Sequence, residues 1–387
     1  MLPDDRGWGY DYLRLSQSWV PMYPRLSMFD TSEFRAGELV EVRSKEEILL
    51  TLDSNGRVEE MPFMPEMFRY CGRRFRVYKR AHKTCDFVNK TGIRKLPSAV
   101  HLEGLRCDGS AHGGCQAECM FFWKDAWLKR ASESVASQPS PMPSPCFHPR
   151  CSSRVAVGCT EQDVSAGTRV AGQEPNDPDP TYVCQATQLP QFTQPIAWWD
   201  FRQYLEDCLS GNVTSVWKLF PRLAYRLYDN LINLGIGVGP ILRWLYDRFQ
   251  SLSGGIPYPA RPGKIPAGSK TPSCSINLKP GELVRVKDQQ AILETVDTYR
   301  RNRGMSFSAE MAPYCGGTYR VHSRVSQIID EKTGKMLRMK NACIILDGVI
   351  CQARYNKKMI FCPRATYAYW REIWLEAAGR NEPTEKD

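Results

Sequence analysis

The sequence predicts an α+β protein made of two homologous, small antiparallel β-barrel units that are linked by a helical segment. Three observations lead to this prediction: a long segment of the chain occurs twice, each copy contains short alternating strands, and the stretch between the copies has helical periodicity. The chain has 387 residues, of which 42% are hydrophobic and 24% are charged. This composition is typical of a globular protein with two or three domains.

The repeated segment starts at residues 37–43, which read GELVEVR, and at residues 281–287, which read GELVRVK. Further identical residues follow in both copies at the same spacing as these two ranges. After a bend the spacing between the copies is three residues longer, and it then pairs Trp123 with Trp370. Chance does not maintain such a register over so long a segment. We therefore predict an N-terminal arm at 1–36, a first barrel at 37–130, a Pro/Ser-rich loop with cysteines at 131–195, a helical segment at 196–252, a linker at 253–280, a second barrel at 281–378 and a tail at 379–387.

Local patterns predict the elements of each copy. Residues 38–43 alternate apolar and polar side chains, as a half-buried strand does, and resemble the first strand of SH3-like barrels. Ser44, with Glu47 three residues later, has the pattern of a capping box, which predicts a short helix over 44–53. Further strands are expected at 75–79 and 319–323, and a hairpin turn at 330–335. Residues 343–351 are expected to form a strand and the turn that follows it.

The segment between the copies is expected to be helical, with breaks at Gly211 and Pro221. One helix face carries Leu242, Leu245, Tyr246 and Phe249, and we expect this face to pack on a barrel. Peripheral membrane contact through residues 231–250 is the alternative. The apolar run in this segment is too short to cross a bilayer.

The first residues lack the apolar core of a signal peptide, which predicts a cytoplasmic protein. In a reducing compartment the 15 cysteines are expected to be thiols or metal ligands rather than disulfides. The formal net charge of +10 favours an anionic ligand or nucleic acid as a partner, alongside another protein.

The densest group of ligand-type residues lies in the bend at 107–119, which reads CDGSAHGGCQAEC. Its glycines permit the tight turn that directs several sulfur atoms to one point. We predict a metal site in the first copy from Cys107, His112, Cys115 and Cys119, with Cys71 or Cys85 as substitutes. The second copy keeps Cys315, Cys351 and Cys362, which predict a three-cysteine or vestigial site. The alternative is that these thiols fill small holes in the core.

Zinc is the expected metal, with a [4Fe–4S] cluster as the alternative. These ligands favour a metal-binding accessory or scaffold protein. A metalloenzyme that uses the thiolate-bound metal is a second hypothesis. A third is nucleic-acid binding through the basic and aromatic strand of the first copy, with Arg74, Arg76, Lys79 and Arg80 as the contacts.

Segments 70–85, 101–107, 182–187 and 369–375, together with the cysteine bend, resemble an uncharacterised bacterial family of cysteine-rich proteins with two SH3-like-barrel-type repeats. The resemblance covers most of the chain. It implies a cytoplasmic accessory component of a bacterial biosynthetic pathway and transfers no catalytic residue.

Overall fold

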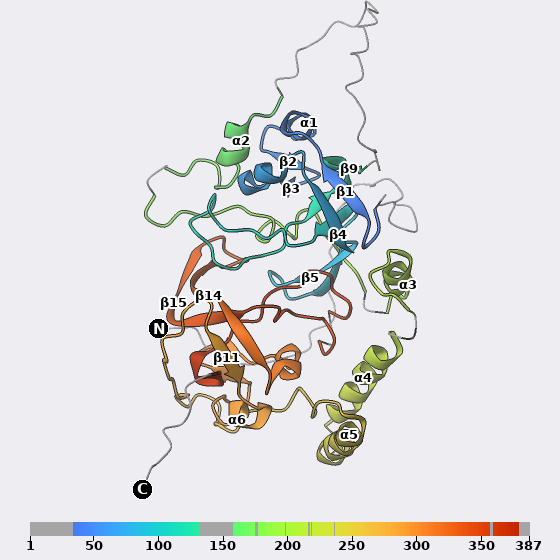
Figure 1. The fold of residues 1–387 in the computed structure, drawn as a ribbon, viewed down its shortest axis with the longest axis vertical. Helices are drawn as coiled ribbons and strands as arrows, with labels where there is room; N and C mark the ends of the chain where they lie inside the picture. Colours follow the sequence, from blue (N-terminus) through green and yellow to red (C-terminus); the bar gives the residue numbers. More distant parts are fainter. Residues whose placement is uncertain are drawn as a thin grey trace, which may run out of the picture.

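The computed structural model describes residues 34–131 and 158–378, apart from 175, 176, 198, 216, 218, 236, 357 and 358. Within these residues the protein is mixed α/β and contains several antiparallel sheets (Figure 1). Most of the predicted N-terminal arm, the loop cysteines Cys146 and Cys151, and the tail lie outside the described residues. Residues 37–130 are called the first half below, and residues 281–378 the second half.

The first half is organised around a five-stranded sheet of order β8-β7-β4-β1-β9. Its strands are β1 (Leu39–Val42), β4 (Arg74–Arg80), β7 (Ala99–Leu102), β8 (Trp123–Lys124) and β9 (Leu128–Arg130). The alternation that predicted β1 is confirmed, because Val40 and Val42 are fully buried while Leu39 and Glu41 face outward.

The second half contains a four-stranded sheet of order β15-β14-β11-β16. Its strands are β11 (Leu283–Val286), β14 (Thr318–Ile329), β15 (Met336–Leu346) and β16 (Leu375–Ala377). Leu39 pairs with Arg76 in the first sheet, and Leu283 pairs with Arg320 in the second. The pairing of β1 with β4 therefore has the same register as the pairing of β11 with β14.

Short helices and hairpins also recur in the same order. The helix α1 (Lys45–Leu49) begins with the predicted capping box, since Ser44 and Glu47 each accept the other's backbone N–H. The remaining short elements are α6 (Gln289–Leu293), the hairpins β2 (Arg57–Val58) with β3 (Met61–Pro62) and β12 (Arg301–Asn302) with β13 (Met305–Ser306), and the 3-10 helices η1 (Pro65–Tyr70), η2 (Asp125–Trp127), η4 (Ala309–Tyr314) and η5 (Glu372–Trp374).

Each half has its own aromatic core. The ring of Phe63 meets Trp127 edge-on at 5.0 Å in the first half, and Phe307 meets Trp374 at 5.6 Å in the second. The four tryptophans of the two cores, Trp123, Trp127, Trp370 and Trp374, are fully buried. Burial of such large rings supplies much of the stability of each half.

A small third sheet, of order β10-β6-β5, comprises β5 (Lys83–Asp86), β6 (Gly92–Lys95) and β10 (Gln194–Pro195). Figure 1 shows β5 between the two larger sheets. Cys85 on β5 packs there with Cys362 of the second half. The helix α2 (Glu161–Ala166) packs beside η1.

The predicted helical segment contains three helices, α3 (Arg202–Leu209), α4 (Leu219–Ile232) and α5 (Gly239–Ser253), along one side of the molecule (Figure 1). Gly211 follows α3 with φ +77°, so the break predicted there is confirmed. The break predicted at Pro221 is wrong. Pro221 lies in the first turn of α4, where a residue has no N–H partner within the helix and proline is tolerated.

The predicted apolar face of α5 is only partly covered. Leu242 and Tyr246 pack against a cluster formed by Tyr225, Ile232 and Tyr258. Leu245 and Phe249 are 46% and 65% exposed, so the expectation that the whole face packs is wrong. In the described part of the chain, no helix combines the length and the apolar character that a membrane span requires.

Candidate metal centre

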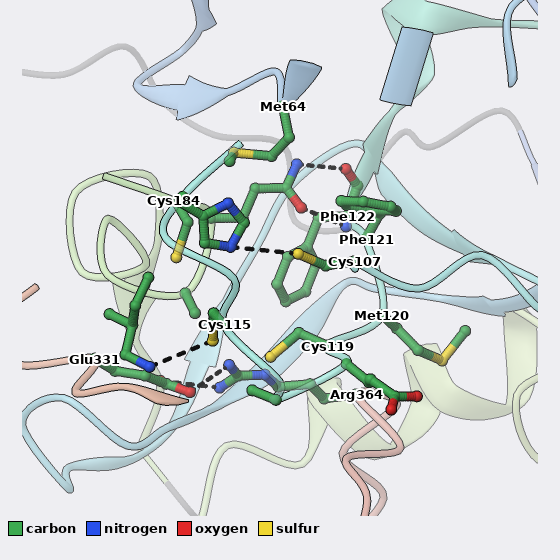
Figure 2. Close-up of a pocket in the computed structure, with 16 residues that line it drawn as sticks. Met64, Cys107, Cys115, Cys119, Met120, Phe121, Phe122, Cys184, Glu331 and Arg364 are labelled. Carbon is green, nitrogen blue, oxygen red and sulfur yellow. Dashed lines mark hydrogen bonds and ion pairs between the residues drawn. The ribbon is translucent and has the colours of Figure 1, made fainter. Parts of the chain in front are cut away.

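A small cavity of about 40 Å³ lies where the cysteine bend of the first half meets the second half. Figure 2 shows the sulfur atoms of four cysteines pointing toward this common space. The thiols belong to Cys107, Cys115, Cys119 and Cys184, and the wall also includes His112, Glu331 and Arg364. Three cysteines of the bend, Cys107, Cys115 and Cys119, therefore line one cavity together with Cys184.

The bend keeps its shape through glycine and backbone hydrogen bonds. Cys107 donates its N–H to the carbonyl of Cys119 at 2.8 Å, which closes the base of the bend. Gly109 has φ +72°, and a side chain there would lie 2.1 Å from the carbonyl oxygen of Cys115. The bend therefore requires glycine at this position.

The closest contacts at the site involve the imidazole of His112. Its Nε2 atom lies 3.4 Å from Sγ of Cys107, and its Nδ1 atom lies 3.2 Å from Oε1 of Glu66 on η1. Glu66 also accepts the backbone N–H of Ala111 at 3.0 Å. Among the described residues, Glu66, Cys107 and His112 form a group of three ligand-type side chains with ligand atoms within 4.8 Å of one another.

Burial sets the protonation of these groups. Burial by itself raises the pKa of the Glu66 carboxyl. The contact with His112 and the hydrogen bonds from backbone N–H groups together outweigh burial, so the pKa of Glu66 lies below its usual value. Burial raises the pKa of Cys107 well above that of a free thiol, and raises those of Cys119 to about 11 and Cys184 to about 12. A cation within the cavity would lower these values, because it stabilises the thiolate.

Backbone N–H groups face two of the sulfur atoms. Gly109 donates to Sγ of Cys107 at 3.3 Å, and Ile329 donates to Sγ of Cys115 at 3.3 Å. Hydrogen bonds of this kind favour the charged form of a thiol. Burial outweighs these hydrogen bonds, however, and the pKa of both thiols stays above its usual value.

The predicted ligands are brought together only in part. Cys107 and His112 are in contact, whereas Cys115 and Cys119 line the cavity outside the group of three. Cys71 packs against the first core and does not line the cavity. Cys315 packs against the second core, while Cys85, Cys351 and Cys362 form a separate cluster in which the Cys85 and Cys362 thiols share a hydrogen bond.

Glu66 and Cys184 belong to this site but are missing from the predicted ligand set. Glu66 precedes Met67 in the first copy as Glu310 precedes Met311 in the second, and this repetition was a signal for a shared role. Cys184 lies far from the bend in sequence, within the segment TYVCQAT, so its spacing gave no indication of a common site.

The second half has a related but different arrangement. Glu310 accepts the backbone N–H of Asn356 at 3.0 Å, and Asn356 follows Cys351 by as many residues as His112 follows Cys107. Asn356 thus stands at the sequence position of His112, but it contacts Glu310 through its backbone N–H rather than its side chain. Its amide nitrogen donates to the sulfur of Met359 at 3.4 Å.

The predicted nucleic-acid contacts do not form one exposed face. Arg74 pairs with Glu41 at 3.2 Å, and Arg76 donates to a backbone carbonyl at 3.1 Å. Burial lowers the pKa of Lys79. Arg80 is buried against Glu206 at 3.4 Å, so it cannot reach a phosphate backbone.

No protein-family model matches the chain, and a comparison with curated proteins gives no match either.

Proposed function

We propose that the protein is a metal-binding accessory protein that holds one zinc ion with Cys107 and His112. The observation that supports this function best is the 3.4 Å separation of Cys107 Sγ and His112 Nε2. Tetrahedral zinc holds sulfur at about 2.3 Å and nitrogen at about 2.0 Å, which places two such ligand atoms roughly 3.5 Å apart.

The other groups of the cavity fit the same role. Glu66 faces Nδ1 of His112, so a proton on Nδ1 leaves the lone pair of Nε2 for the metal. Cys119 and Cys184 line the same cavity outside the group of three, and we propose that they move toward the ion as the remaining ligands, which gives three sulfurs and one nitrogen. A cavity of about 40 Å³ suits a single ion better than the eight heavy atoms of a [4Fe–4S] cube.

We favour the accessory role over metalloenzyme chemistry because the proposed ligand set fills all four positions with protein ligands. Structural zinc sites are closed in this way, whereas catalytic sites keep a position for water or substrate. In this proposal the two halves are copies of one SH3-like unit, of which the first alone retains a complete site. Their matching strand registers support a common origin.

An accessory protein needs a partner, and the groove beside α4 and α5 is the surface proposed for it. This groove has a volume of about 900 Å³ and is lined by aromatic and aliphatic side chains, among them Phe220, Tyr228, Leu245 and Phe249. The carboxylates of residues 199–253 are buried or paired, whereas Arg222 and Arg354 line the groove. The concave shape favours an apolar helix with acidic flanks over a flat membrane.

A thiol–imidazole–carboxylate relay is the second candidate, because Cys107, His112 and Glu66 are in contact in that order. Nucleophilic cysteines have lowered pKa values. Burial raises the pKa of Cys107 instead, so the metal site is favoured.

Elemental analysis and a visible spectrum of anaerobically purified full-length protein test the proposal. We expect one zinc per chain and no visible absorption band. The zinc should be lost in Cys107→Ser and retained in Cys351→Ser, which makes the same change in the half that lacks the imidazole. Wild-type protein free of metal, with Cys107 rapidly alkylated by iodoacetamide, would contradict the metal site and support the relay.

A further inference from the structure

The second half contains a polar cavity of about 220 Å³, separate from the cysteine site. Positively charged side chains dominate its wall. The cations are Arg303, Arg324, Lys340 and Arg371, and the carboxylate among the lining residues is Glu372. Such a surplus of like charge is costly unless a counter-charge is present.

The corresponding place in the first half has a different charge arrangement. The hairpin β2–β3 corresponds to β12–β13, with Glu59 at φ 48° in the first and Arg303 at φ 47° in the second. Lys124 and Arg371 each stand immediately before a 3-10 helix, as the N-caps of η2 and η5. Glu59 therefore corresponds to Arg303, and Lys124 to Arg371.

In the first half these positions form an ion pair, with Nζ of Lys124 2.5 Å from Oε2 of Glu59. In the second half both positions are arginines. Arg371 is more than nine-tenths buried, and its Nη2 donates to the backbone carbonyl of Arg303 at 3.0 Å rather than to a carboxylate. Its Nε atom is buried without a hydrogen-bond partner. The anionic partner present in the first half is missing from this place in the second.

Glu372 does not replace that partner, because its carboxylate is already committed. Its Oε2 atom accepts from Ser275 Oγ at 2.6 Å and from the N–H of Ile276 at 2.9 Å, and its Oε1 atom pairs with Arg324. The guanidinium of Arg303 is held in place by the carbonyl of Thr271 at 2.7 Å. Arg371 also donates through Nη1 to the carbonyl of Asn341. Arg303 and Arg371 are thus fixed in position by neutral acceptors, which leave their positive charges uncompensated.

We propose that this cavity binds a small anionic ligand through a phosphoryl group. Guanidinium groups present paired donors that match the oxygens of phosphate, and fixed arginines lose little side-chain freedom on binding. The volume has room for a phosphoryl group with a small substituent. Lys340 on β15 is exposed and supplies a further positive charge at the mouth of the cavity.

Calorimetric titration of the full-length protein with inorganic phosphate, and separately with glycerol 3-phosphate, tests this site. Arg303→Glu introduces the residue that the first half has, so it should pair with Arg371 and weaken phosphate binding at least tenfold. Arg301→Glu makes the same change of charge on the neighbouring strand residue outside the cavity lining and should bind as the wild type does.

The thermal midpoint without ligand separates loss of the site from loss of the fold. We expect Arg303→Glu to melt at or above the wild-type temperature, since it removes a like-charge contact. Tighter binding of glycerol 3-phosphate than of phosphate would assign the site to a phosphorylated metabolite, and the reverse order to free phosphate. Wild-type protein that binds neither at millimolar concentration, or equal binding by both variants, would overturn the proposal.

Discussion

Asn356 stands in the second half where His112 stands in the first, five residues after a cysteine and beside a buried glutamate. The imidazole of His112 offers a nitrogen lone pair to a metal ion, whereas the amide nitrogen of Asn356 has none. Thr366 likewise replaces Cys119. These two differences explain why we propose a metal site in one half only.

The carboxylate of Glu66 is expected to orient His112 rather than to hold the fold together. Glu66→Gln keeps the shape and the acceptor for Ala111 N–H but removes the charge beside Nδ1. We expect zinc affinity to fall by about 10- to 100-fold, measured by competition with a chromophoric chelator. Glu310→Gln is the matched control and should leave the affinity unchanged. Equal affinities in the two variants would rule out the orienting role.

Arg364 is buried beside the cysteine cavity, and its guanidinium lies 2.7 Å from Glu331. Glu331→Ala leaves this charge without its ion-pair partner and should lower the free energy of unfolding by about 3–5 kcal/mol. The double variant Glu331→Ala/Arg364→Met removes both charges and should recover part of that loss. Urea unfolding measures both values, and strictly additive effects would show that the two groups are not coupled.

His101 on β7 is fully buried, and burial, together with nearby arginines, lowers its pKa to about 3 although Nδ1 contacts the carbonyl of Phe121 at 2.9 Å. The unfolded chain binds a proton at His101 near pH 6.5, whereas the folded chain does not until about pH 3. The contribution of neutral, buried His101 to the free energy of unfolding should therefore be fully present above pH 6.5. It should be lost progressively as the pH falls from 6.5 to 3.

Between these two pH values, His101 is expected to change the free energy of unfolding by about 1.4 kcal/mol per pH unit. Urea unfolding of wild type and His101→Gln at a series of pH values measures it, and the variant should lose this part of the slope. His322→Gln changes an exposed histidine and serves as the control. An unchanged slope in His101→Gln would contradict the prediction.

The groove beside α4 and α5 should bind apolar molecules through Phe249. Native protein is expected to enhance the fluorescence of the dye ANS, and Phe249→Ser should reduce that enhancement severalfold. Leu252→Ser alters a side chain that is 89% exposed but does not line the groove, and should have little effect. Co-sedimentation with anionic phosphatidylglycerol vesicles that depends equally on both residues would favour a membrane instead.

Much of the local structure could be predicted from sequence because it depends on neighbouring residues. Ser44 and Glu47 start α1 through contacts three residues apart, and Gly109 allows the bend because it lacks a side chain. The alternation of residues 38–43 likewise identified the buried positions of β1. Pro221 was misassigned because its effect depends on its place within the helix, which periodicity alone does not fix.

The sequence by itself determined that Cys107 and His112 share one glycine-rich bend and that the second copy lacks the histidine. Tertiary structure decided that Glu66 faces His112, that Cys184 reaches the same cavity, and that Cys85 meets Cys362 instead. It also brought Arg371 against the backbone of Arg303. Such contacts join segments far apart in the chain, and they depend on how sheets and loops pack, which sequence spacing does not specify.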